Sequence, residues 1–179
     1  MTALVVYESM YGNTQAVARA IAEGIGDAQV VEVGVAPTAL PADLDLLVVG
    51  GPTHVHGMSR PQTRADAGVR VDRPVVSKAD GVREWTGRVR ADHPILAAAF
   101  DTRVPAPELF TGSAAKGIEK SLRHQGARVM AVESFVLDGV KGGPFDRVAP
   151  AELERARAWG RALTAERSIG AMEIDRVLG

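Results

Sequence analysis

The stretch that decides the fold is "ALVVYESMYGNTQAVARAIAEG", residues 3–24. Its apolar run, Ala3–Tyr7, stops at Glu8 and gives way to short polar residues and a glycine. Over Asn13–Ile25 the apolar residues then recur at spacings of three and four, which is the pattern of an amphipathic helix. The sequence therefore predicts a buried strand that turns directly into a helix, with two hydroxyls, an amide and a glycine at the turn.

Similar apolar runs recur along the chain, and helical patterns separate them. The runs are short and rich in β-branched residues, and several are apolar on both faces, which is typical of strands in a buried parallel sheet. The predicted strands are Ala3–Tyr7, Ala28–Val35, Leu44–Val49, Ile95–Phe100 and Arg128–Leu137. Further helices are expected near Lys78–Val89, Thr111–Gln125 and Pro150–Glu166, and Met58–Ser77 is expected to be a surface loop with a turn or two of helix.

Alternation of strands and helices over this length predicts one three-layer, doubly wound α/β domain, residues 1–166. Residues 167–179 form a tail that is more apolar than a disordered end needs to be. We expect the tail to pack on its own domain or on a second copy of the chain in a homodimer, and the sequence leaves both open. Trp85 and Trp159 lie within helical patterns and are expected to pack in the core.

Composition excludes several classes of function. The 179 residues include 21 basic and 22 acidic residues, which gives a formal net charge of -1. This charge lacks the excess of basic residues expected of a protein that binds nucleic acid or a membrane surface. Cysteine is absent, which excludes disulfides, thiolate metal sites and cysteine nucleophiles. No segment reaches the roughly 20 apolar residues of a membrane span, and the N-terminus lacks a signal-peptide pattern, so the expected location is the cytoplasm.

Three polar loops are expected to meet at one edge of the sheet. In a doubly wound sheet, ligands bind beyond the carboxyl ends of the strands, where the strand order reverses. The loops that follow the first, third and fourth strands are "ESMYGNT" (8–14), "GGPTHVHGM" (50–58) and "FDTRVPAP" (100–107). All three are rich in turn formers and polar groups, which makes this edge the predicted ligand site.

The first loop has the features of a phosphate site. The start of a helix leaves backbone N–H groups unpaired and carries a partial positive charge. Ser9, Asn13 and Thr14 add short donors at the same point, and Gly12 allows close approach of the backbone. Such a cradle suits a phosphate held without lysine or arginine. The alternative is an ordinary helix N-cap, although a cap needs only one such residue.

Other phosphate motifs are absent. The sequence has no G-x-x-x-x-G-K-[ST] and no G-x-G-x-x-G after its first strand. A phosphatase loop would need a cysteine. A receiver domain would need clustered aspartates at the end of the first strand, where only Glu8 is present.

At this point the sequence resembles a known family. "VVYESMYGNT" is similar to the phosphate loop of flavodoxin-like flavoproteins, whose usual form is Ser/Thr-x-Ser/Thr-Gly-Asn-Thr, with Tyr11 in place of the third-position hydroxyl residue. The "SMYG" form resembles that of the flavodoxin-like quinone reductases, whose second loop also starts Pro-Thr, as Pro52–Thr53 does here. The resemblance implies a flavodoxin-like fold with a five-stranded parallel sheet in the order 2-1-3-4-5. It also implies an FMN cofactor, with its phosphate on the first loop and its ring between the second and third loops. The implied cofactor-binding residues are Ser9, Met10, Tyr11, Gly12, Asn13, Thr14, Pro52, Thr53, His54, Val55, His56, Gly57, Asp101, Thr102 and Arg103.

The resemblance implies a redox function in one of two forms: electron transfer with a partner protein, or NAD(P)H-dependent reduction of a quinone-like acceptor. Unlike flavodoxins, the third loop has no aromatic residue between Asp101 and Glu108 to stack on the ring. Arg103, His54 and His56 would stabilise negative charge near the ring, so we expect a higher flavin potential than that of a flavodoxin. The alternative function is a non-catalytic flavodoxin-fold module that has lost tight flavin binding and acts through protein contacts.

Individual side chains of these loops have competing interpretations. His54 and His56 share a face of extended chain, as two metal ligands would, but no third ligand is visible nearby, so no metal site is predicted. His54 is a better candidate for a proton donor, because histidine titrates near neutral pH. Asp101 is expected to pair with Arg103, to accept a hydrogen bond from a flavin N–H, or simply to form a turn. No catalytic residue can be named, because the cofactor performs the chemistry.

Overall fold

A six-stranded sheet forms the centre of the computed structural model, which describes residues 2–54, 57–69, 74–105, 112–139 and 146–178, with side chains as far as residue 165. Among these residues the strand order is β2-β1-β3-β4-β5-β6. The first five strands run parallel, so the predicted order 2-1-3-4-5 is confirmed. The strands are β1 (Ala3–Tyr7), β2 (Ala28–Glu32), β3 (Leu46–Pro52), β4 (Leu96–Arg103), β5 (Arg128–Asp138) and β6 (Arg147–Val148).

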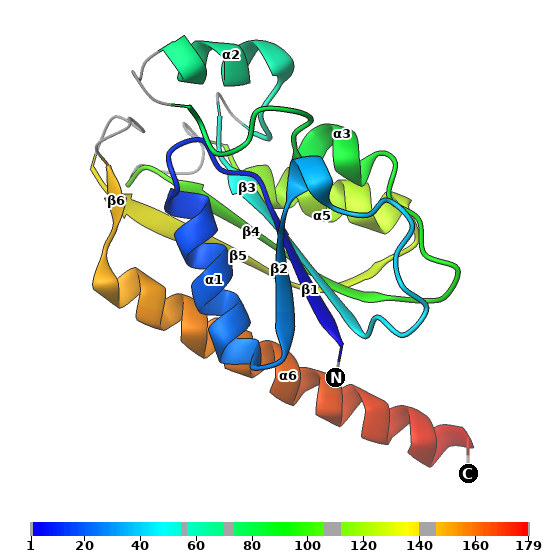
Figure 1. Cartoon of the computed structure of the whole chain (residues 1–179). Helices are drawn as coiled ribbons and strands as arrows, with labels where there is room; N and C mark the ends of the chain where they lie inside the picture. The colour runs from blue at the N-terminus through cyan, green and yellow to red at the C-terminus, as the bar shows by residue number, and fades with distance from the viewer. Residues whose placement is uncertain (1, 55–56, 70–73, 106–111, 140–145, 179) are drawn as a thin grey trace.

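Helices cover both faces of the sheet (Figure 1). On one face lie α1 (Asn13–Ile25) and α6 (Pro150–Leu178), and on the other lie α3 (Val82–Thr86) and α5 (Ala114–His124). A further helix, α2 (Pro61–Val69), stands above the carboxyl edge of the sheet (Figure 1). The three-layer, doubly wound prediction is therefore confirmed. Within the described residues, no helix is both long and apolar enough to cross a bilayer.

Strand β1 shows why the sheet is buried on both sides. Successive side chains of a strand point to opposite faces. Val5 and Tyr7 pack in the core beneath α1 and α6, whereas Leu4 and Val6 pack in the core beneath α3 and α5. Each of these four side chains is at most 5% exposed, which explains the uninterrupted apolar run in the sequence.

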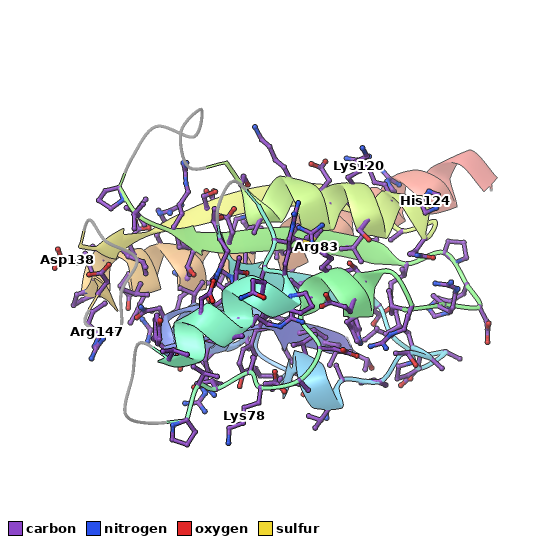
Figure 2. The ribbon with its side chains drawn as sticks, turned by 90° about the horizontal axis from the view of Figure 1, so that it is seen from above. Lys78, Arg83, Lys120, His124, Asp138 and Arg147 are labelled. Atoms are coloured by element: carbon purple, nitrogen blue, oxygen red, sulfur yellow. The ribbon has the colours of Figure 1, made fainter. Side chains whose placement is uncertain are left out.

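The sixth strand was not predicted from the sequence. β6 has two residues and pairs antiparallel with β5, with Asp138 opposite Arg147 (Figure 2). A two-residue strand carries no periodicity, so the pattern could not reveal it. The predicted strand Ala28–Val35 also ends early, because its last residues form a short 3₁₀ turn, η1 (Val33–Val35), whose first amides are capped by Glu32.

Two helices differ in length from their predictions. α3 is confined to Val82–Thr86 by Gly81 and Gly87, although the pattern suggested Lys78–Val89. α6 continues to Leu178, so the predicted boundary between residues 166 and 167 falls inside one helix. Figure 1 shows its C-terminal part extending past the sheet. The division into domain and tail, and the homodimer contact of the tail, stay predictions.

Close helix packing and aromatic packing stabilise the face formed by α1 and α6. Gly24 and Gly160 lie where the two helices cross, and a Cβ added to either would overlap a backbone carbonyl of the other helix. Trp159 packs edge-to-face against Phe100 and Phe135. Trp85 is buried in the opposite core. Both tryptophans thus have the predicted core roles.

Candidate functional site

The three polar loops meet at the carboxyl edge of the sheet. From β1 the chain passes to β2 on one side and then to β3 on the other, so the strand order reverses next to β1. The hydroxyls of Thr14 and Thr102 lie 2.8 Å apart, and the Thr53 amide donates to the Thr102 carbonyl at 2.9 Å. The structure therefore brings together residues of the first, second and third loops, as the sequence predicted.

The N-terminus of α1 presents amides that lack acceptors. Gly12 precedes the helix with φ of 96°, a conformation that L side chains rarely adopt. The amides of Asn13, Thr14 and Gln15 have no intrahelical acceptor by position, and none of the described residues accepts from them. A Cβ built on Gly12 would meet no atom of the described residues within 4 Å. None of these residues blocks the helix end at Gly12, and the partial charge there favours an anion.

The side chains of the same loop hold the loop itself. Ser9 is 0% exposed, and its Oγ accepts a hydrogen bond from the Gly12 amide at 3.1 Å. Thr14 is 1% exposed and bonds to Thr102. Asn13 Nδ2 donates to the Asp146 carbonyl at 2.9 Å. The three side chains thus have partners within the protein, whereas the Asn13, Thr14 and Gln15 amides have none among the described residues.

A distant segment pairs with the first loop. The amides of Val76 and Ser77 donate to the carbonyls of Met10 and Ser9, at 3.0 and 2.8 Å. In return the Ser9 amide donates to Ser77 Oγ at 2.9 Å. Ser9 and Ser77 are 68 positions apart in the chain, so no local pattern in the sequence could have indicated these contacts.

Asp101 is buried at the N-terminus of α5. Its Oδ2 accepts hydrogen bonds from the hydroxyls of Ser113 and Thr53, at 2.7 and 3.0 Å, and from the Ala115 amide at 2.9 Å. Its Oδ1 is buried without a hydrogen-bond partner among the described residues. The simple-turn interpretation is therefore wrong, because Asp101 lies within β4 and joins the second loop to α5. A bond from a flavin N–H to Oδ1 stays a prediction.

Two residues of the second loop pair with each other. His54 and Gly57 exchange backbone hydrogen bonds, at 2.8 and 3.0 Å, shortly after Pro52 ends β3. Val55 and His56 lie outside the described residues, so their contacts with the ring stay predictions. Among the described residues there is no group of three or more side chains that could hold a metal ion. Arg103 ends β4 and is half-buried.

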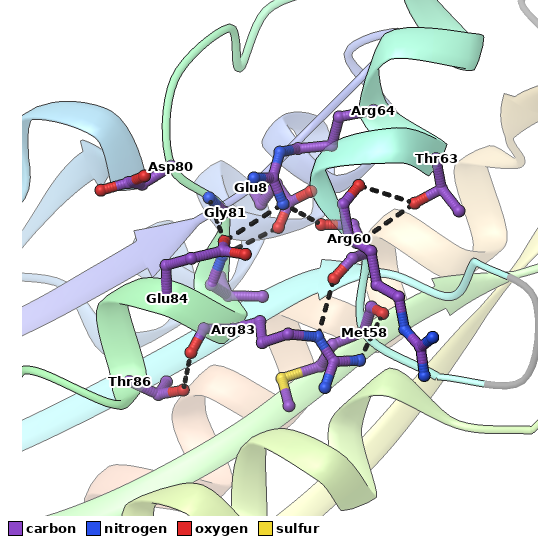
Figure 3. Close-up of polar contacts among 12 residues, drawn as sticks. Glu8, Met58, Arg60, Thr63, Arg64, Asp80, Gly81, Arg83, Glu84 and Thr86 are labelled. Carbon is purple, nitrogen blue, oxygen red and sulfur yellow. Dashed lines mark hydrogen bonds and ion pairs between the residues drawn. The ribbon is translucent and has the colours of Figure 1, made fainter.

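A buried charged cluster lies behind the first loop (Figure 3). Glu8 is 0% exposed, and its Oε2 accepts from the Val82 amide at 2.8 Å. Arg64 of α2 donates to Ser59 Oγ at 3.0 Å and pairs with Glu84 at 3.1 Å. Glu84 also accepts from the Gly81 amide at 2.8 Å. We call Glu8, Ser59, Arg64 and Glu84 the Glu8 cluster.

Burial raises the pKa of Glu8. Removal from water raises its pKa above the ordinary 4.5, although the hydrogen bonds from Ser59 and Val82 and the charge of Arg64 oppose this. The neighbouring Glu84 raises the pKa further. The sequence indicated no role for this cluster. A charged residue, Glu8, directly after an apolar strand was the only hint of a buried charge, because the other residues of the cluster are 51 or more positions away.

The raised pKa gives a pH-dependent stability test. A carboxyl group whose folded-state pKa is raised stabilises the fold below its unfolded pKa, and that stability is lost as pH rises through the folded pKa. Glu8→Gln has no such titration. The free energy of unfolding of the variant, minus that of the wild type, is therefore expected to increase above pH 4.5, by at most about 1.4 kcal/mol per pH unit. Urea denaturation between pH 4.5 and 7.5 measures it, and a difference that stays constant over this range would contradict the assignment.

Known proteins that are similar to this chain include flavodoxins. Residues 5–67, from β1 into α2, match the flavodoxin family model. A flavodoxin from the domain Archaea matches with a TM-score of 0.59 and 20% identity, over 94% of this chain and 99% of that one. The Streptococcus pneumonia TIGR4 flavodoxin matches with a TM-score of 0.59 and 16% identity, over 93% and 99%. A flavone reductase matches with a TM-score of 0.56 and 14% identity, over 94% of this chain but 63% of that one. No curated protein sequence matches.

The solved structures agree with the fold described above. The flavodoxin-like architecture extends over nearly the whole chain, and the match to the family model covers most of β1, the first loop and α1. The chain therefore has a flavodoxin-like fold.

Proposed function

We propose that this protein binds FMN at the carboxyl edge of its sheet and uses it in redox chemistry. The phosphate would lie on the amides of Asn13, Thr14 and Gln15, and the ring between the second and third loops. FMN supplies the chemistry of accepting and releasing electrons and hydride. The chain's own groups bind and orient it, and His54 is the candidate proton donor at the second loop.

The N-termini of α1, α3 and α5 differ in what the chain provides for them, and this difference carries the proposal. The Val82 amide of α3 donates to the buried Glu8, and the Ala115 amide of α5 donates to the buried Asp101. α1 has no acidic residue in its first turn, and no described carboxyl group accepts from its first amides. The N-terminus of a helix favours negative charge. The N-terminus of α1, at the point of strand reversal, therefore fits an external anion.

Two redox activities are compatible with this site. An electron carrier would exchange electrons with a partner protein, and a reductase would accept hydride from NAD(P)H and reduce a quinone-like acceptor. The flavodoxin and flavone reductase folds that match this chain support either. FMN titration followed by stopped-flow reduction with NADH and NADPH separates them. Fast reduction supports the reductase, whereas binding without reduction supports the carrier.

The flavin potential is a further expectation. Arg103 and His54 place positive or neutral donors beside the proposed ring, and no described carboxylate other than the engaged Asp101 lies in these two loops. Positive charge stabilises the reduced, anionic ring. We therefore expect a midpoint potential above that of low-potential flavodoxins. A redox titration of the FMN-loaded protein measures it, and a flavodoxin-like low potential would refute this expectation.

A second function has one observation in its favour. The side chains of Ser9, Asn13 and Thr14 already have protein partners, as expected of a module that has lost tight flavin binding and acts through protein contacts. The colour of the purified protein discriminates between the two. A yellow sample, or a colourless one that takes up added FMN, supports the redox function. A colourless sample that fails to take up FMN supports the module.

A further inference from the structure

Helix α2 covers the phosphate loop without an apolar anchor. Its buried residues are Arg64 and Ala67, one of them charged, and Val69 at its end is 87% exposed. Most helices gain their stability from an apolar face packed on the core. α2 stands above the carboxyl edge of the sheet and has almost no such face (Figure 1). Polar contacts must therefore hold it in place.

Among the described residues, polar contacts of Arg64 and of the Ala67 carbonyl join α2 to other elements. In the first, Arg64 reaches into the Glu8 cluster, where it bonds Ser59 and pairs with Glu84 (Figure 3). In the second, the Tyr11 hydroxyl donates to the Ala67 carbonyl at 3.0 Å. Ala67 lies in the last turn of α2, where carbonyls have no intrahelical donor, so Tyr11 caps the C-terminus of this helix. The Tyr11 contact is the one that originates in the phosphate loop.

Tyr11 occupies the third position of the "SMYGNT" loop, where the family pattern has a short hydroxyl residue. Its hydroxyl is directed at α2 rather than at the amides of α1. Tyr11 also directly precedes Gly12, whose backbone conformation positions the first amides of that helix. The backbone between the proposed anion site and the α2 contact is thus a single residue long.

We propose that Tyr11 is a positioning residue that couples occupancy of the phosphate loop to closure of α2. The proposal rests on the proposed function in so far as the anion is the phosphate of FMN. An anion on the α1 amides fixes Gly12 and hence Tyr11, and Tyr11 in turn holds α2 over the loop. By reciprocity, an ordered α2 slows loss of the anion. Local opening of α2 is the step that speeds release of the ligand.

Hydrogen exchange of the free protein tests the tether first. Tyr11→Phe keeps the ring and removes only the hydroxyl, so the amides of residues 61–69 are expected to exchange about five-fold faster than in the wild type, as the loss of one hydrogen bond implies. Tyr7→Phe is the matched control, since its hydroxyl accepts from Gln15 on α1 and does not contact α2. Unchanged exchange in Tyr11→Phe, or an equal increase in both variants, would overturn the proposal.

Inorganic phosphate and FMN test the coupling. Phosphate is expected to slow exchange of α2 in the wild type but not in Tyr11→Phe. FMN is expected to dissociate about five-fold faster from Tyr11→Phe, with little change in its association rate. Equal protection of α2 in both proteins, or equal dissociation rates, would overturn the coupling. If neither protein binds FMN, the proposed function fails, while the exchange of the free proteins still decides whether Tyr11 holds α2.

Discussion

Asn13→Asp is expected to weaken FMN binding on the order of 100-fold. The substitution preserves the shape of the side chain but places a carboxylate at the first residue of α1, beside the amides proposed to hold a dianionic phosphate. Two unit charges about 4 Å apart repel by about 4 kcal/mol near a protein surface, and solvent reduces this at the half-buried Asn13. FMN titration followed by absorbance or fluorescence measures the effect.

Protein stability should change little in this variant, which separates a binding defect from a folding defect. A carboxylate in the first turn interacts favourably with the helix dipole, and this offsets the lost hydrogen bond to the Asp146 carbonyl. The free energy of unfolding is therefore expected to stay within about 1 kcal/mol of the wild type. Gln29→Glu, on exposed β2, makes the same change in net charge and should bind FMN normally. Equal affinity of Asn13→Asp and wild type would contradict an anion site at α1.

Asp101→Ala is expected to lower the free energy of unfolding by about 3 kcal/mol. The carboxylate accepts from Thr53, Ser113 and the Ala115 amide, and it fills the N-terminus of α5. Each charge-assisted bond contributes about 1.5–3 kcal/mol, but burying the carboxylate with one oxygen unpartnered offsets part of the sum. The alanine variant leaves three donors without this acceptor.

Urea denaturation measures the loss at Asp101. Asp66→Ala is the matched control, because Asp66 is exposed on α2 and bonds only to the neighbouring Gln62. That variant should stay within about 0.5 kcal/mol of the wild type. A loss below 1 kcal/mol for Asp101→Ala would show that α5 and the second loop do not depend on this carboxylate.

The parts of the fold that follow local rules were predictable from the sequence. β1 and α1 each carry a sustained pattern, and the predicted bounds of both, Ala3–Tyr7 and Asn13–Ile25, are those observed. The strand order was implied by the resemblance to flavodoxin-like proteins, and the meeting of three loops follows from the general rule for doubly wound sheets. β6 was not predicted and α3 was predicted too long, because two and five residues are too few to show a period.

The contacts within the site depend on residues far apart in the chain. Ser9 meets Ser77, Tyr11 meets Ala67, and Glu8 lies in a cluster with Arg64 and Glu84. These pairs are separated by loops whose path no periodicity encodes. The sequence therefore predicted that the three loops meet but could not show that Ser9 and Thr14 of the first loop are buried. It also could not show that α2 lies above the loop.

Two buried carboxyl groups and one proposed anion site lie at the carboxyl edge of the sheet. Glu8 accepts from the Val82 amide of α3, and Asp101 accepts from the Ala115 amide of α5. In the proposed function, the N-terminus of α1 is the one that takes the ligand. Because the donors at α1 are backbone amides, substitution of Ser9 or Thr14 would disturb the shape of the loop more than its chemistry.

Backbone amide NMR of labelled protein, titrated in parallel with FMN and riboflavin, most directly measures whether α1 holds the phosphate of a flavin. If α1 holds the phosphate, FMN should cause large downfield shifts of the Asn13, Thr14 and Gln15 amides. Riboflavin, which lacks the phosphate, should bind at least about 100-fold more weakly than FMN. FMN and riboflavin that bind equally well, or FMN that binds without shifting these three amides, would contradict a phosphate site at α1.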